Sequence, residues 1–207
     1  MNITWYGQSC FRIQNTQQNV LIDPYSPRQA GLRGPNFKST ITILTNPEDK
    51  KAIEKDSKES FLITSPGEYE ISGSFVYGTS FIRKDKKLTI YQVEMDNIRF
   101  GILGEINSSL TSEELENLDG IDVLFVPIGG GAMIGPEKAV ETINSIEPRI
   151  IIPCCYQIPK IKIKLGSLEK FLREMGVKKV EKLPKLNLRK NDLSSEETKI
   201  VVLEPRA

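Results

Sequence analysis

The chain has 207 residues, 39% of them apolar and 27% charged, with a formal net charge of +1, which predicts one globular domain over residues 1–207 with a sizeable core. No apolar run reaches the ~18 residues of a membrane-spanning helix, and the first residues lack the basic and apolar regions of a signal peptide. The three cysteines give neither an even disulfide framework nor a C-x-x-C spacing, which fits a reducing compartment. We therefore expect a cytoplasmic protein that does not enter a membrane.

Short strands dominate the first half of the chain. β-prone runs separated by Gly, Gln and Asn predict a meander followed by a compact apolar strand, at Asn2–Trp5, Cys10–Ile13, Asn19–Ile22 and Thr40–Leu44. After the fourth strand, Asn46 is expected to cap a helix that has Pro47 at its first position and runs to about Lys55. Further strands are predicted at Phe61–Ile63, Phe75–Arg83, Lys87–Glu94 and Ile98–Leu103, with Met95-Asp96-Asn97 as a hairpin turn.

Strands and helices alternate in the second half. Thr111 and Glu114 have the spacing of a capping box at a helix start. The elements expected after it are a strand at Asp122–Pro127, a Gly129-Gly130-Gly131 turn, a helix from Pro136 that buries Ala139, Val140, Ile143 and Ile146, a buried strand at Arg149–Pro153, a helix at Ser167–Met175, a loop region rich in Lys and Pro, and a final strand at Lys199–Leu203. This order predicts an α/β (α+β) fold in which two sheets pack together and helices lie outside.

Positive charge is concentrated near the C-terminus. The segment Lys160–Lys190 has 11 Lys or Arg against three acidic residues. Two interpretations stay open: a solvated helix face with its loops, which we favour, or a surface for nucleic acid. Only Phe171 interrupts the basic run, so a stacking platform for single strands is not evident.

Seven short segments along the chain resemble one family. They stay in register over almost the whole sequence, and they are Trp5-Tyr6-Gly7-Gln8-Ser9-Cys10-Phe11, Leu21-Ile22-Asp23-Pro24, Leu44-Thr45, Pro66-Gly67-Glu68-Tyr69-Glu70, Leu103-Gly104-Glu105, Asp122-Val123-Leu124 with Pro127-Ile128-Gly129-Gly130, and Ile152-Pro153 with Tyr156. Together they resemble the metallo-β-lactamase superfamily, in its small branch of ascorbate-phosphate lactonases and "Zn-dependent hydrolases". The resemblance implies a four-layer αβ/βα sandwich, in which two mixed sheets pack face to face with helices outside.

The resemblance also implies a dinuclear centre of zinc or manganese, held mainly by histidines that follow strand ends. This chain contains no histidine. The positions that match the centre are Gln8, Asn46, Glu48, Lys50, Lys51, Ile102, Glu105 and Cys155. Of these, Glu48, Glu105 and Cys155 retain a donor for a divalent cation, whereas a protonated Lys has no lone pair to offer.

These substitutions predict a dismantled metal centre with no catalytic residue and no metal cofactor. The leading hypothesis is a binding or scaffold protein for a protein partner or a small anionic molecule, with Lys50 and Lys51 as candidate anion-binding residues.

Alternative functions stay open beside it. One is a hydrolase for a lactone, a phosphorylated sugar or a phosphodiester, with metal on Glu48, Glu105 and Cys155 or supplied with the substrate. Another is nucleic-acid binding through Lys160–Lys190. A nucleophile at Ser9 or Cys155 would lack the usual histidine base. The family resemblance also makes a homo-oligomer an open alternative.

Overall fold

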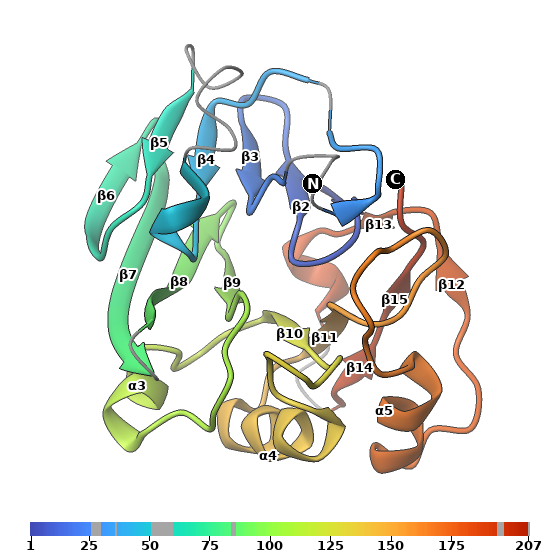
Figure 1. The fold of residues 1–207 in the computed structure, drawn as a ribbon. Coiled ribbons are helices and arrows are strands. Elements are labelled where there is room, and N and C mark those ends of the chain that lie inside the picture. Colours follow the sequence, from blue (N-terminus) through green and yellow to red (C-terminus); the bar gives the residue numbers. More distant parts are fainter. Residues whose placement is uncertain (26–29, 36, 51–59, 84–85, 194–196, 207) are drawn as a thin grey trace.

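The computed structural model describes residues 1–25, 30–35, 37–50, 60–83, 86–193 and 197–206. Two mixed β-sheets pack against each other (Figure 1). The first has the strand order β13-β1-β2-β3-β4-β5. Its strands are β1 (Asn2–Trp5), β2 (Phe11–Gln14), β3 (Asn19–Ile22), β4 (Ile41–Ile43), β5 (Phe61–Ile63) and β13 (Leu186–Asn187). The predicted meander is confirmed: β1, β2 and β3 pair antiparallel, after which β4 and β5 join in parallel.

The second sheet has the order β14-β11-β10-β9-β8-β7-β6. Its strands are β6 (Gly67–Ile71), β7 (Ser74–Arg83), β8 (Lys86–Met95), β9 (Ile98–Ile102), β10 (Val123–Pro127), β11 (Ile150–Cys154) and β14 (Lys199–Ile200). The strands β6 to β9 are antiparallel, and β9, β10, β11 and β14 are parallel. The predicted hairpin turn is confirmed, since Asp96 and Asn97 have φ of 50° and 60° between β8 and β9, as a primed two-residue turn requires.

Aromatic side chains hold the two sheets together. The rings of Phe11 on β2 and Phe125 on β10 lie 4.3 Å apart, and Trp5 on β1 contacts Tyr156 at 5.0 Å. These four side chains are buried, and so is every residue of β10 and β11. The interior between the sheets is therefore one continuous apolar core.

The described helices are short. They are α3 (Ser112–Glu116), α4 (Pro136–Ile146) and α5 (Leu168–Glu174), with the 3-10 turns η1 (Pro47–Asp49) and η2 (Lys190–Asp192). Figure 1 shows α4 and α5 side by side against the second sheet. The capping box of Thr111 and Glu114 is present, and α4 buries Ala139, Ile143 and Ile146 as predicted. Of these helices, none has the length and apolar character needed to cross a bilayer.

The structure corrects two predictions of local structure. The expected final strand Lys199–Leu203 is divided at Val201: β14 pairs with β11, whereas β15 (Val202–Leu203) pairs with β12 (Lys182–Leu183). The loop rich in Lys and Pro accordingly contains two short strands, β12 and β13. The helix expected from Pro47 to about Lys55 begins as the 3-10 turn η1 and continues into the helical residue Lys50, and the rest of the predicted helix lies outside the described residues.

Candidate functional site

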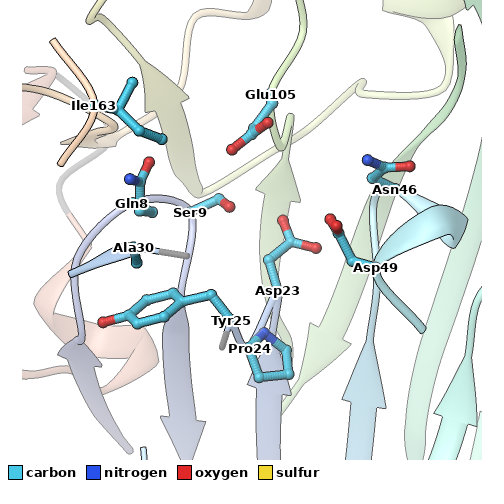
Figure 2. A pocket seen from close by; sticks show the side chains of 10 residues that line it. All are labelled: Gln8, Ser9, Asp23, Pro24, Tyr25, Ala30, Asn46, Asp49, Glu105 and Ile163. Atoms are coloured by element: carbon cyan, nitrogen blue, oxygen red, sulfur yellow. The ribbon is translucent and has the colours of Figure 1, made fainter. Parts of the chain in front are cut away.

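A pocket of about 210 Å³ lies where strand ends of both sheets meet (Figure 2). Its walls come from the loops that follow β1, β3, β4 and β9, and from a segment before α5. The lining residues are Gln8, Ser9, Asp23, Pro24, Tyr25, Ala30, Asn46, Asp49, Glu105 and Ile163. Parallel strands such as β3 and β4 bring the loops at their carboxyl ends to one edge of the sheet, which places polar side chains close together there.

Asp23 lies at the base of the pocket, directly after β3. One carboxylate oxygen, Oδ1, accepts a hydrogen bond from the Thr45 backbone N–H at 2.7 Å, and Oδ2 accepts one from Thr45 Oγ1 at 2.7 Å. Burial raises the pKa of Asp23 to about 7, against the lowering effect of these two bonds, and the negative charges of Glu105 and Asp49 raise it further. The carboxyl group is thus rigidly held and costly to ionise.

Glu105 enters the pocket from the second sheet, on the loop after β9. Figure 2 shows Glu105 and Asp23 pointing toward one another. Gly104 makes this approach possible, because it has a φ of 61° and a Cβ on it would collide with the Thr45 side chain. The same Thr45 therefore fixes Asp23 and supports the loop that carries Glu105.

Gln8 lines the wall of the pocket across from Asn46 and Asp49 (Figure 2). Its backbone oxygen accepts hydrogen bonds from Trp5 Nε1 at 2.8 Å and from the Cys155 N–H at 3.3 Å, which fix the loop after β1. Gln8 has a φ of 53° and is only 6% exposed, yet its side-chain oxygen Oε1 has no hydrogen-bond partner. A buried acceptor left in this state carries a desolvation cost of about 1–3 kcal/mol.

Asn46 and Asp49 contribute the wall formed by η1. Asn46 Oδ1 accepts a hydrogen bond from the Glu48 N–H at 3.1 Å, which confirms its capping role. Asn46, which precedes η1, and Asp49, its last residue, both line the pocket. Glu48 and Lys50 are exposed and are not lining residues, and Lys51 lies outside the described part of the chain.

Ile102 and Cys155 belong to the core. Ile102 on β9 is paired with Phe125 and Tyr91 and is 2% exposed, while Cys155 is fully buried with a φ of 54°. A hydrogen bond with the Cys154 side chain and burial raise the pKa of the Cys155 thiol well above its usual value. Cys155 therefore lies inside the core and does not line the pocket.

Only some of the positions picked from the sequence meet in this pocket. The structure brings together Gln8, Asn46 and Glu105, and adds Asp23 and Asp49, which sequence reasoning had not selected. Asp23 stood inside a matched segment, whereas Asp49 had been interpreted only as an acidic residue near a helix start.

The donors present do not fit a pair of zinc or manganese ions. Each oxygen of Asp23 already accepts a hydrogen bond from Thr45, Ile102 has no donor atom in its side chain, and Cys155 is buried in the core outside the pocket lining. In the described ranges, no group of three or more His, Cys, Asp or Glu is arranged to hold a metal ion.

Comparisons with known proteins identify the family of the chain. A family model for the β-lactamase superfamily domain matches residues 2–155. A UPF0173 protein of Pyrococcus abyssi is 27% identical over 87% of this chain and 93% of its own length, and a UPF0173 metal-dependent hydrolase of Methanocaldococcus jannaschii is 24% identical over 89% and 97%.

Solved structures of other proteins have the same fold as this chain. A metallo-β-lactamase superfamily protein of Thermotoga maritima superimposes with a TM-score of 0.82 at 27% identity, covering 99% of each chain. A metallo hydrolase of Ignicoccus hospitalis gives 0.64 at 17% identity, covering 91% of this chain and 99% of its own. The four-layer sandwich expected from the resemblance is therefore confirmed as the fold class.

Proposed function

Since the chain belongs to the metallo-β-lactamase superfamily, we propose that it uses the superfamily's pocket to bind a small molecule, without the metal-dependent hydrolysis for which its relatives are named. One observation carries the proposal. Of the positions that match the superfamily's metal ligands, Ile102 has an apolar core side chain, Cys155 is buried in the core outside the pocket lining, and Glu48 and Lys50 are exposed outside that lining. A pocket of about 210 Å³ nevertheless persists.

Each group near the pocket then has a binding or structural role. Thr45 and Gly104 hold the loops in place, while Gln8, Asn46, Asp49 and Glu105 offer polar atoms to a ligand. The apolar surface of Ile163 supports the uncharged part of that ligand. The chain supplies no imidazole to take up a proton from an attacking water.

A metal analysis of tag-free protein tests the proposal. The protein is incubated with excess Zn²⁺ or Mn²⁺, desalted and measured by mass spectrometry, alongside hydrolase assays on lactones, phosphorylated sugars and phosphodiesters. We expect far less than one equivalent of metal and no turnover that a chelator abolishes. One or two retained equivalents with chelator-sensitive turnover would refute it.

A hydrolase is the second candidate, because curated relatives carry the name metal-dependent hydrolase and because Asp23, with a pKa of about 7, is an acid near neutrality inside the pocket. Its metal would need other donors than those first considered. Glu48 is exposed outside the lining and Cys155 is buried in the core, so only Glu105 of that trio reaches the pocket.

Other sequence predictions remain proposals. An anionic ligand at Lys50 and Lys51 would bind beside the pocket, since Lys50 is exposed and directly follows Asp49. Nucleic-acid binding through Lys160–Lys190 predicts an affinity that falls steeply with salt. A protein partner or a homo-oligomer would be detected by light scattering.

A further inference from the structure

The second sheet carries two aromatic side chains that the described helices leave uncovered. Phe75 and Tyr77 on β7 are 37% and 40% exposed, whereas Ser74 and Val76 beside them are buried. Because successive side chains of a strand point to opposite faces, Phe75 and Tyr77 point away from the core that contains Val76. Figure 1 shows α3 near the other end of β7, and α4 lies against β10. Two neighbouring exposed rings are typical of a surface that another molecule covers.

Carboxylates border these two rings. The antiparallel register of β6 and β7 places Glu68 opposite Tyr77 and Glu70 opposite Phe75, and residues directly opposite each other share one face of a sheet. Both glutamates are exposed, and neither has an ion-pair partner within the described ranges. We call these four residues the acidic aromatic face. It extends to an open edge, since β6 is the last strand of its sheet.

The opposite end of the molecule is basic. Lys178 and Lys179 follow α5, Lys182 begins β12, and Lys185 lies just after it; all four are exposed. We call these four residues the basic end. Among the described residues, Lys178, Lys179 and Lys185 form no ion pair. Figure 1 places α5 and β12 on the side of the molecule that is remote from β6.

The charge of the chain is therefore separated in space. The segment Lys160–Lys190 has 11 basic and three acidic residues and carries +8, so the remainder carries −7 within an overall charge of +1. A net charge this small gives little general repulsion between copies of the chain. Local attraction between unlike surfaces can then determine how two copies meet.

We propose that a second copy of this chain covers the acidic aromatic face with its basic end. The lysine stems of one copy pack on the rings of Phe75 and Tyr77 of the other, while the ammonium groups reach Glu68 and Glu70. Because the two surfaces differ and lie at opposite ends, each copy can contact two neighbours. The contact is thus head-to-tail and builds open chains or a ring. It is independent of the ligand-binding function proposed above.

Charge and exposure favour a second copy over nucleic acid at these surfaces. A nucleic acid would neutralise the basic end, but Glu68 and Glu70 would repel it, so Phe75 and Tyr77 would stay uncovered. A second copy covers the rings and neutralises both charged surfaces in one contact. Tyrosine is also one of the residues that contribute most to protein interfaces.

Sedimentation velocity of the full chain over a concentration series, after nuclease treatment, tests the proposal. At an ionic strength of about 0.01 M, where the Debye length is about 30 Å, the average mass should rise with concentration beyond that of a dimer. At about 1 M, where it is about 3 Å, the mass should return toward that of the monomer. A monomer at every concentration and low ionic strength would overturn the proposal. Association that nuclease treatment abolishes would also overturn it, because nucleic acid would then bridge the copies.

Exposed substitutions locate the contact. Glu70→Lys should weaken self-association at least about tenfold, because it places like charges together, and Tyr77→Thr should do so by removing a ring. The double variant Lys179→Ala/Lys182→Ala should have the same effect from the other surface. Glu141→Lys is the control, since it makes the same change of charge at an exposed position of α4. Equal losses in Glu70→Lys and Glu141→Lys would indicate a general charge effect and overturn the proposal.

Mixing two impaired variants tests the head-to-tail arrangement itself. Glu70→Lys retains an intact basic end, and Lys179→Ala/Lys182→Ala retains an intact acidic aromatic face. An equimolar mixture should therefore form dimers of one copy of each that do not grow further. A mixture that stays monomeric under conditions in which the wild-type chain associates would overturn the proposal.

Discussion

The substitution Asp23→Asn isolates the energetic cost of a buried acid. In the folded chain, Asp23 is buried against Thr45 with a pKa raised to about 7, whereas its ordinary value is 3.8. An asparagine retains both contacts, because its oxygen accepts from the Thr45 N–H and its amide donates to Thr45 Oγ1. The substitution therefore removes the titration while it keeps the geometry.

The sign of the effect follows from proton linkage. Between pH 3.8 and about 7 the folded chain binds this proton more tightly than the unfolded chain does, so stability falls as pH rises and levels off above pH 7. The full effect is about 4 kcal/mol at about 1.36 kcal/mol per pKa unit. Between pH 5 and pH 8 the wild-type protein should lose about 2.5 kcal/mol relative to Asp23→Asn.

Urea unfolding of both proteins at pH 5, 6, 7 and 8 measures this difference. The fixed cost of the substitution cancels, because only the change of the difference with pH matters. Glu48→Gln controls for net charge, since Glu48 is exposed outside the pocket. Stability curves for wild type and Asp23→Asn that run parallel from pH 5 to pH 8 would refute the reasoning.

Two further substitutions test the framework of the fold. Gly104→Ala should destabilise the chain by about 2 kcal/mol or more, because residue 104 has a φ of 61° and the new Cβ would collide with the Thr45 side chain. Thermal unfolding measures this loss of stability, and an unchanged midpoint would contradict the clash. Asp122→Ala removes a buried carboxylate that pairs with Arg149 at 3.2 Å and Lys190 at 2.9 Å. Both cations are about half exposed and can be hydrated, so the expected loss in urea unfolding is only about 1–2 kcal/mol. A loss above about 4 kcal/mol would show that their charges become buried and unpaired.

Local signals explain why most elements were predictable. The helix Pro136–Ile146 has a proline at its first position and apolar residues at helical spacing, and both features act within the helix and against one sheet. The turn at Asp96 and Asn97 depends on two residues that tolerate a positive φ. Where the determinant is local, the sequence is sufficient.

Long-range pairing was not predictable in the same way. The strands β12, β13 and β15 have two residues each, which is too short for any period to appear. They exist because β13 meets β1 and β12 meets β15 across large distances in sequence. Their formation is a consequence of the packed sheets.

The residues of the pocket also divide into those that the sequence could place and those that it could not. Matching a metal-binding spacing to the chain selected Glu48 and Lys50, which presupposes the backbone path of the metal-bound relatives. In this chain the segment begins as the 3-10 turn η1, and Asp49 lines the pocket whereas Glu48 and Lys50 do not. The position of the site was predictable from the family resemblance, but the set of residues that line it was not.

Fold and ligand are separable here because different atoms determine them. The pocket exists where backbone strands of two sheets end, and those ends are set by a core that Ile102 and Cys155 help to fill. Core-filling side chains at Ile102 and Cys155 are therefore compatible with intact sheets and with a pocket at the strand ends. The same burial that shapes the pocket raises the pKa of Asp23 to about 7, and the nearby charges of Glu105 and Asp49 raise it further, so the core that fixes the fold also sets the protonation of this acid.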